Sequence, residues 1–286
     1  MSEPGGRASD AASRPRGGAI LDWTSSADGI ALRVRRRPGA PLAVVAPLGC
    51  WLADAIEDAA PGRAVLAYDP RGRGESGPLA DGAPVGIERD VADLERLMAR
   101  VSGPVAGVGW GYYGAVLAAF AARWPDRVER LALISPLPLT RDPGMAVARA
   151  RLRRSTAHRG HGGPPPSPLG VEEGAIDVFG TANAGPFADP LGLESERPAE
   201  LAALLARLER ALGAWDWRAI ATGLGMPMLV IHGGLDVIGV EWARQWVQLA
   251  DRAKLFVMSG ATRYPWLECP GYFTAALAHF LGDPEV

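Results

Sequence analysis

The chain has few residues that could form disulfide bonds or bind metal, and it lacks a long apolar segment. It has 286 residues but only two cysteines, Cys50 and Cys269, and four histidines. Two cysteines cannot form a disulfide framework and match no zinc spacing, so we expect a reducing cytoplasm and no metal or other cofactor. No apolar run is long enough to span a bilayer, and residues 1–18 lack the apolar core of a signal peptide. We expect those residues to be a disordered tail.

The chain also lacks a strong charge of either sign. Its formal net charge is −2, which gives no reason to expect nucleic acid or an acidic membrane as a partner. Its 48% apolar and 22% charged residues suit a globular protein with a sizeable core. We expect a small-molecule substrate as the partner, and the sequence leaves a homodimer open.

Strand signals alternate with helical signals along most of the chain. The predicted strands cover residues 19–24, 30–34, 42–46, 64–68, 105–107, 131–134, 228–231 and 255–258. The predicted helices cover residues 87–101, 112–124, 240–249 and 270–281. This alternation predicts an α/β fold with a mostly parallel central sheet flanked by helices.

The alternation stops between residues 137 and 225. This part has helical segments at 145–155, 171–178 and 199–212, a Gly- and Pro-rich loop at 158–168, and no convincing strand. We predict a core formed by residues 19–136 and 226–286, interrupted by an all-helical lid. Lids of this kind enclose an apolar substrate site.

Five short motifs occur in a fixed order. They cover residues 68–76 (YDPRGRGES), 107–111 (GVGWG), 124–128 (WPDRV), 232–236 (HGGLD) and 259–268 (SGATRYPWLE). From Ala19 to the C-terminus the chain resembles the α/β-hydrolase superfamily, especially its lidded branch of proline-iminopeptidase-like and C–C-hydrolase-like proteins. The resemblance implies an α/β-hydrolase fold with a helical lid insertion.

The resemblance also implies which residues stand in the catalytic positions. Gly109 takes the place of the nucleophile, Arg263 that of the histidine, and Asp236 that of the acid. Glycines on both sides of a strand-to-helix turn permit a strained backbone there. The backbone N–H groups of Trp110 and Cys50 would then form an oxyanion hole.

Two of these replacements remove the chemistry of a serine hydrolase. Gly109 has no hydroxyl to attack a carbonyl, and Arg263 stays protonated and cannot act as a general base. Because the triad acts as a unit, we expect no ordinary serine hydrolysis. In one interpretation Arg263 only balances Asp236; in the other, it also binds an anionic substrate group through its fork of donors.

Other residues have both a structural and a functional interpretation. Gly109 would give the pocket room, and Tyr112 and Tyr264 would line it, whereas Tyr113 and Trp266 either line it or pack the fold. The remaining candidates for chemistry are most simply buried packing residues or solvated loop residues, with catalysis as the alternative. They are His232, His279, His158, His161 and Cys50.

Three functions follow, in order of preference. The first is a non-hydrolytic enzyme that binds an anionic or carbonyl substrate under the lid and catalyses cyclisation, elimination or isomerisation without a covalent intermediate, as in natural-product biosynthesis. The second is an inactive hydrolase kept as a binding or interaction protein. The third is a hydrolase with an unconventional nucleophile.

Overall fold

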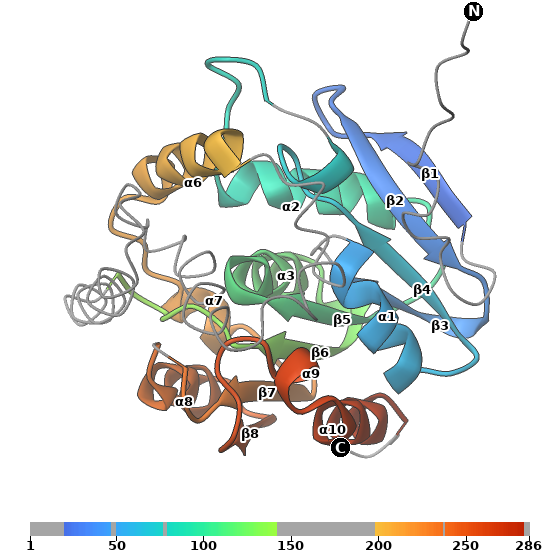
Figure 1. Cartoon of the computed structure of the whole chain (residues 1–286), viewed down its shortest axis with the longest axis vertical. Helices are drawn as coiled ribbons and strands as arrows, with labels where there is room; N and C mark the ends of the chain where they lie inside the picture. The colour runs from blue at the N-terminus through green and yellow to red at the C-terminus, as the bar shows by residue number, and fades with distance from the viewer. Residues whose placement is uncertain (1–19, 47–49, 77–78, 142–197, 237, 283–286) are drawn as a thin grey trace, which may run out of the picture.

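The central feature of the molecule is one sheet of eight strands (Figure 1). The computed structural model describes residues 20–46, 50–76, 79–141, 198–236 and 238–282. The strand order is β1-β2-β4-β3-β5-β6-β7-β8. The strands are β1 (Ile20–Ser25), β2 (Ala31–Arg37), β3 (Ala40–Ala46), β4 (Arg63–Tyr68), β5 (Val105–Trp110), β6 (Val128–Ile134), β7 (Met228–Gly233) and β8 (Ala253–Met258).

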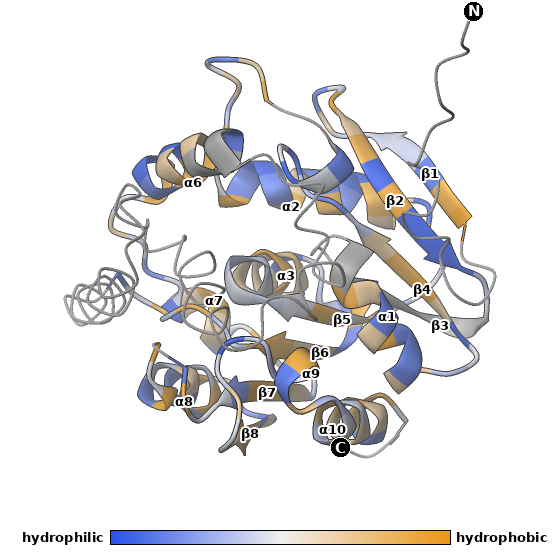
Figure 2. Ribbon diagram, in the orientation of Figure 1, coloured by the Kyte–Doolittle hydropathy of each residue, from blue (hydrophilic) through white to orange (hydrophobic). Residues whose placement is uncertain are grey.

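Most of the sheet is parallel, as the sequence predicted. β1 pairs with β2 and β2 with β4 in antiparallel fashion, and every other neighbouring pair is parallel. All residues of β5 and β7 are buried, which accounts for their largely apolar sequences. Figure 2 shows hydrophobic residues concentrated in these central strands and hydrophilic residues along the outer helices.

Helices cover the sheet in two groups, and within each group neighbouring helices contact one another. α1 (Cys50–Ala59) packs with α10 (Pro270–Gly282), while α2 (Ile87–Met98), α3 (Gly111–Arg123), α7 (Arg218–Thr222) and α8 (Val240–Leu249) form a continuous series. The short helix α9 (Pro265–Glu268) leads into α10, and 3-10 turns lie at Gly74–Ser76 and Pro125–Arg127. The described part of the chain contains no helix long and apolar enough to cross a membrane.

The helix α6 (Pro198–Leu212) lies alongside α2 and the loop before it (Figure 1). Arg207 donates hydrogen bonds to the carbonyls of Ala80 and Ala83. At the end of α6, an ion pair of 3.1 Å joins Glu209 to Arg141. These contacts fix the one predicted lid helix that the structure describes.

The predicted elements are confirmed in most of the core, with differences at the ends. The strand predicted at 105–107 continues through Val105–Trp110, and the helices α1, α7 and α9 had no counterpart in the prediction. The lid segments 145–155 and 171–178, and the loop with His158 and His161, lie outside the described residues. The division into tail, core and lid stays a prediction.

Candidate functional site

Four loops meet at the carboxyl edge of the parallel strands, where α/β proteins bind their ligands. They follow β5, β6, β7 and β8 and bring together Gly111, Ser135, Asp236 and Arg263. These residues lie far apart in the sequence. Their proximity depends on the order β5-β6-β7-β8 in the sheet.

The strand-to-helix turn after β5 is centred on Gly111. β5 ends at Trp110, α3 begins at Gly111, and Gly111 has a φ of 56°. Such a positive φ is the strained backbone typical of a nucleophile elbow. The motif pattern predicts this turn at Gly109, two residues earlier in the chain. That placement is wrong because Gly109 is still within the β5–β6 ladder, opposite Leu133.

Gly109 instead lets helix α3 approach the sheet. A Cβ added at Gly109 would lie 2.9 Å from the Cα of Gly114 and 2.9 Å from Cδ1 of Leu117. It would also lie 3.0 Å from the carbonyl oxygen of Tyr113. The missing side chain is therefore a packing requirement, and the expectation that Gly109 adds room to a pocket is wrong.

Trp110 links the turn to the loop that carries Arg263. Its indole N–H donates a hydrogen bond of 3.0 Å to the carbonyl oxygen of Arg263. Its ring centroid lies 5.3 Å from that of Tyr264 and 5.6 Å from that of Trp266. Because Trp110 is the last residue of the strand, the amide that follows the turn belongs to Tyr112 and not, as predicted, to Trp110.

Asp236 and Arg263 form a buried ion pair, the juxtaposition that the sequence predicted. Nη1 of Arg263 lies 3.3 Å from Oδ2 of Asp236, and the two side chains are 1% and 0% exposed. The other carboxylate oxygen accepts the backbone N–H of Ile238 at 2.9 Å. The guanidinium carbon also lies 5.5 Å from the ring of Trp110, a cation–π distance.

Glu268 holds the Arg263 loop in place. Its two carboxylate oxygens accept the backbone N–H and the hydroxyl of Thr262, each at 2.6 Å. Burial raises the pKa of Glu268, although the Thr262 hydrogen bonds oppose that shift. Sequence reasoning missed this residue, since its only signal was an acidic side chain six positions after Thr262 in the same loop.

Tyr112, which the sequence predicted to line a pocket, has its hydroxyl directed toward helix α2. Its hydroxyl donates a hydrogen bond of 2.7 Å to Oδ2 of Asp90, and both residues are buried. Burial raises the pKa of Asp90 to about 7, with a smaller opposing effect from the Tyr112 hydrogen bond. Nothing in the amino-acid sequence indicated this pair, because Asp90 looks like an ordinary acidic residue in the first turn of a helix.

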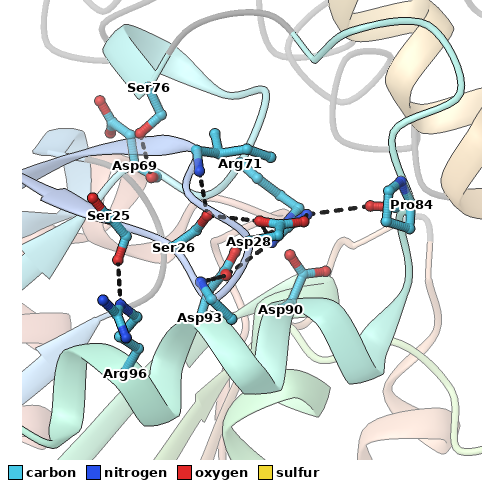
Figure 3. Close-up of polar contacts among 12 residues, drawn as sticks. Ser25, Ser26, Asp28, Asp69, Arg71, Ser76, Pro84, Asp90, Asp93 and Arg96 are labelled. Atoms are coloured by element: carbon cyan, nitrogen blue, oxygen red, sulfur yellow. Dashed lines mark hydrogen bonds and ion pairs between the residues drawn. The ribbon is translucent and has the colours of Figure 1, made fainter.

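A salt-bridge network lies next to Asp90 (Figure 3). Arg71 donates to both oxygens of Asp93 at 2.8 Å and to Asp28 at 3.0 and 3.1 Å. The Arg71 hydrogen bond lowers the pKa of Asp28 to about 2. The network ties the loop after β4 to α2 and to the β1–β2 hairpin, which gives Arg71 of the 68–76 motif a structural role.

The other predicted residues lie in differing surroundings. Tyr113, Tyr264 and Trp266 are buried in aromatic contacts, which favours packing for Tyr113 and Trp266. Cys50 is the first residue of α1. His232 is fully buried, with Nε2 2.8 Å from the carbonyl oxygen of Ile238.

This geometry defines an α/β protein with a strand-to-helix elbow and an acid-bearing loop at one edge of its sheet. A family model described as "Alpha/beta hydrolase family" matches residues 38–276, and the chain belongs to that family. The chain is 31% identical over 194 residues to a pimeloyl-[acyl-carrier protein] methyl ester esterase of Chromobacterium violaceum. That match covers 67% of this chain and 74% of the relative.

Solved structures show the same fold. A hydrolase from Pseudomonas aeruginosa superposes with a TM-score of 0.68 at 22% identity, covering 92% of this chain and 98% of the other. An esterase from Exiguobacterium antarcticum gives 0.71 at 16% identity, covering 92% and 100%. A proline iminopeptidase from Mycobacterium smegmatis gives 0.62 at 19% identity, covering 92% and 98%. At these identities the likeness concerns the fold.

Proposed function

We propose that this protein is a non-hydrolytic enzyme of the alpha/beta hydrolase family, with Gly111 in the nucleophile position and Arg263 in the histidine position. It acts on a small molecule with a carbonyl or carboxylate group and catalyses a cyclisation, elimination or isomerisation without a covalent intermediate. Such a reaction suits a step in natural-product biosynthesis. The observation that carries the proposal is the glycine at the strained turn, φ 56°, where a serine hydrolase needs a hydroxyl.

The remaining groups can stabilise negative charge but cannot form an acyl-enzyme. The backbone N–H of Tyr112 follows the turn at the start of α3, where the helix dipole favours an anion. Arg263 keeps a fixed positive charge at this edge of the sheet and supplies no lone pair for general-base catalysis. Preorganised donors of this kind stabilise an enolate or a similar oxyanion.

A catalytically inactive binding protein is the second candidate. The burial of the Asp236–Arg263 pair, 0% and 1% exposed, favours it, because each charge already has its partner. A hydrolase with a relocated nucleophile is the third candidate, and the esterase relative supports it. For all three we propose a small-molecule partner, no nucleic acid or membrane partner, and leave a homodimer open.

Chemical labelling separates the first two candidates from the third. With no hydroxyl at Gly111, the purified protein is expected neither to hydrolyse short-chain nitrophenyl esters nor to react with a fluorophosphonate probe. Intact mass and peptide mapping would locate any adduct. Stoichiometric labelling of any serine would overturn the non-hydrolytic function.

A further inference from the structure

Two buried polar side chains at the carboxyl edge have no role in the proposed function. Ser135, directly after β6, has a φ of 42° and is the sole non-glycine residue with positive φ in the described ranges. Ser135 and His232 are both 0% exposed. Within the part of the chain that the structure describes, neither Oγ of Ser135 nor Nδ1 of His232 has a hydrogen-bond partner.

The two residues lie level with each other on neighbouring strands. β6 and β7 are parallel, with Leu133 opposite Val230 and Ile134 opposite Ile231. The backbone N–H of Ser135 donates a hydrogen bond of 2.8 Å to the carbonyl oxygen of Ile231, which continues this register by one residue. Ser135 is therefore opposite His232.

The hydrogen bond at Nε2 determines which nitrogen of His232 can accept a proton. Nε2 lies 2.8 Å from the carbonyl oxygen of Ile238, and a carbonyl oxygen only accepts hydrogen bonds. Nε2 therefore carries the proton, and Nδ1 keeps a free lone pair. Burial lowers the pKa of His232, so the ring is neutral near neutral pH. Asp236, Glu241 and Arg263 are the charged groups that act on it.

A hydroxyl and an acceptor are thus buried without hydrogen-bond partners at the same level of two neighbouring strands, and the residue that carries the hydroxyl has a strained backbone. Buried polar groups are rarely left without a hydrogen bond, and strained residues cluster where a ligand is held. A water molecule bonded to both groups would satisfy them, since a hydroxyl can donate or accept and Nδ1 accepts.

We propose that Ser135 and His232 hold one internal water molecule and that this water passes a proton from the substrate to Nδ1 of His232. The second part rests on the proposed function, which needs a proton acceptor that the ion-paired Asp236 and Arg263 do not supply. The substrate proton moves to the water oxygen as one proton of that water moves to Nδ1, so the water is regenerated. The electron pair left behind resides on the substrate as an enolate near the Tyr112 N–H. Asp236, with Oδ2 3.9 Å from Nε2, faces the imidazolium that forms.

Histidine side-chain NMR of the full chain tests the water site without any activity. In the native protein we expect His232 to be protonated at Nε2, with Nδ1 in the shift range of a hydrogen-bonded acceptor. Ser135→Ala and Ser135→Gly both remove the hydroxyl, but only glycine relieves the positive φ. Both variants should therefore shift the Nδ1 resonance by a similar amount, whereas Ser102→Ala, at an exposed position, should not. A high-resolution crystal structure should show one water between Oγ and Nδ1.

Three results of the NMR and crystallographic experiments would overturn the water site. They are a proton on Nδ1 in the native protein, an Nδ1 resonance that neither Ser135 variant changes, and a direct Oγ–Nδ1 hydrogen bond with no water between. Fluorophosphonate labelling of Ser135 would also overturn it, because the hydroxyl would then be a nucleophile.

Proton exchange tests the second part with pyruvate, an anionic carbonyl compound, as the probe. We expect the native protein to exchange the methyl protons of pyruvate in D2O faster than buffer does. In His232→Gln the rate of this exchange should be at least tenfold lower. Equal rates in native and variant would overturn the proton-acceptor role and leave the proposed function standing. If the native protein does not exceed buffer, the proton-acceptor role and the non-hydrolytic enzyme both fail for this class of substrate, whereas the NMR result still decides the water site.

Discussion

At the residue scale, the candidate site has the backbone geometry of the alpha/beta hydrolase fold, and the side chains at two of its positions set it apart. Gly111 has the positive φ of a nucleophile elbow but no side chain, and Arg263 is paired with Asp236, in the position where our proposed function places the missing general base. Under the proposed function, a residue with no hydroxyl and a residue with a permanent charge change the chemistry without changing the fold.

Restoring the two side chains is the direct test of this assignment. Gly111→Ser with Arg263→His should fold and gain fluorophosphonate labelling or measurable hydrolysis of a nitrophenyl ester, because serine tolerates this φ at an elbow. Gly109→Ser with Arg263→His is the matched control. Its added Cβ would collide with the backbone of Gly114, so it should lower stability by about 1–3 kcal/mol and gain no labelling. Labelling of the control variant but not of the first variant would show that Gly109, and not Gly111, occupies the nucleophile position.

The buried ion pair predicts an asymmetric response to substitution. Arg263→Met leaves the carboxylate of Asp236 buried without its cation and should lower the free energy of unfolding by about 3–5 kcal/mol. Adding Asp236→Asn removes the uncompensated charge and should recover most of that loss. Urea denaturation of the two variants measures both values. A single variant as stable as the native protein would show that the pair is solvated.

At the element scale, the loops after β7 and β8 must approach one another very closely to bring Asp236 and Arg263 together. A Cβ added at Gly233, the last residue of β7, would lie 1.7 Å from the carbonyl oxygen of Thr262. Glu268 in α9 also accepts two hydrogen bonds from Thr262. The site therefore depends on backbone contact between loops as much as on its side chains.

Gly233→Ala should consequently disrupt this contact. The new methyl group meets backbone that cannot rotate away, so we expect a loss of about 3 kcal/mol in the free energy of unfolding. Gly271→Ala is the control, because nothing lies within 4 Å of its added Cβ and it is in helix α10. Alanine there should raise stability by about 0.5–1 kcal/mol. Equal melting temperatures for the two variants would argue against the close approach of the loops.

At the scale of the whole molecule, the buried carboxyl of Asp90 should make the stability of the fold depend on pH. Its pKa rises from the ordinary value of 3.8 to about 7 on folding, chiefly through burial. Between these two values the folded state binds a proton that the unfolded state has lost. Stability is therefore highest below the lower value and falls as the pH rises toward 7, by up to about 4 kcal/mol.

Asp90→Asn isolates this contribution. Asparagine is neutral at every pH and can still accept the Tyr112 hydroxyl, so the variant should lose the downward slope of stability between about pH 4 and pH 7. Asp126→Asn, at an exposed position, removes the same formal charge and should leave the slope in place. Melting temperatures across this range make the comparison. A native slope retained in Asp90→Asn would show that other groups cause it.

The sequence by itself determined the fold class, the order of the motifs and the pairing of Asp236 with Arg263. Apolar periodicity and glycine-rich turns are local properties, so strands, helices and the family resemblance can be read from short windows. The absence of a hydroxyl at the turn also followed from the sequence, since Gly107, Gly109 and Gly111 are all glycines.

Only the tertiary structure decided which of these glycines is the turn. Three glycines at alternate positions look equivalent in a sequence, and what separates them is the packing of α3 against Gly109 and the backbone twist at Gly111. The Asp90–Tyr112 hydrogen bond and the Ser135–His232 juxtaposition were hidden for a related reason. A parallel sheet sets side by side residues that are distant along the chain, and their burial, which changes their pKa values and leaves polar atoms unpaired, exists only once the sheet and its helices have assembled.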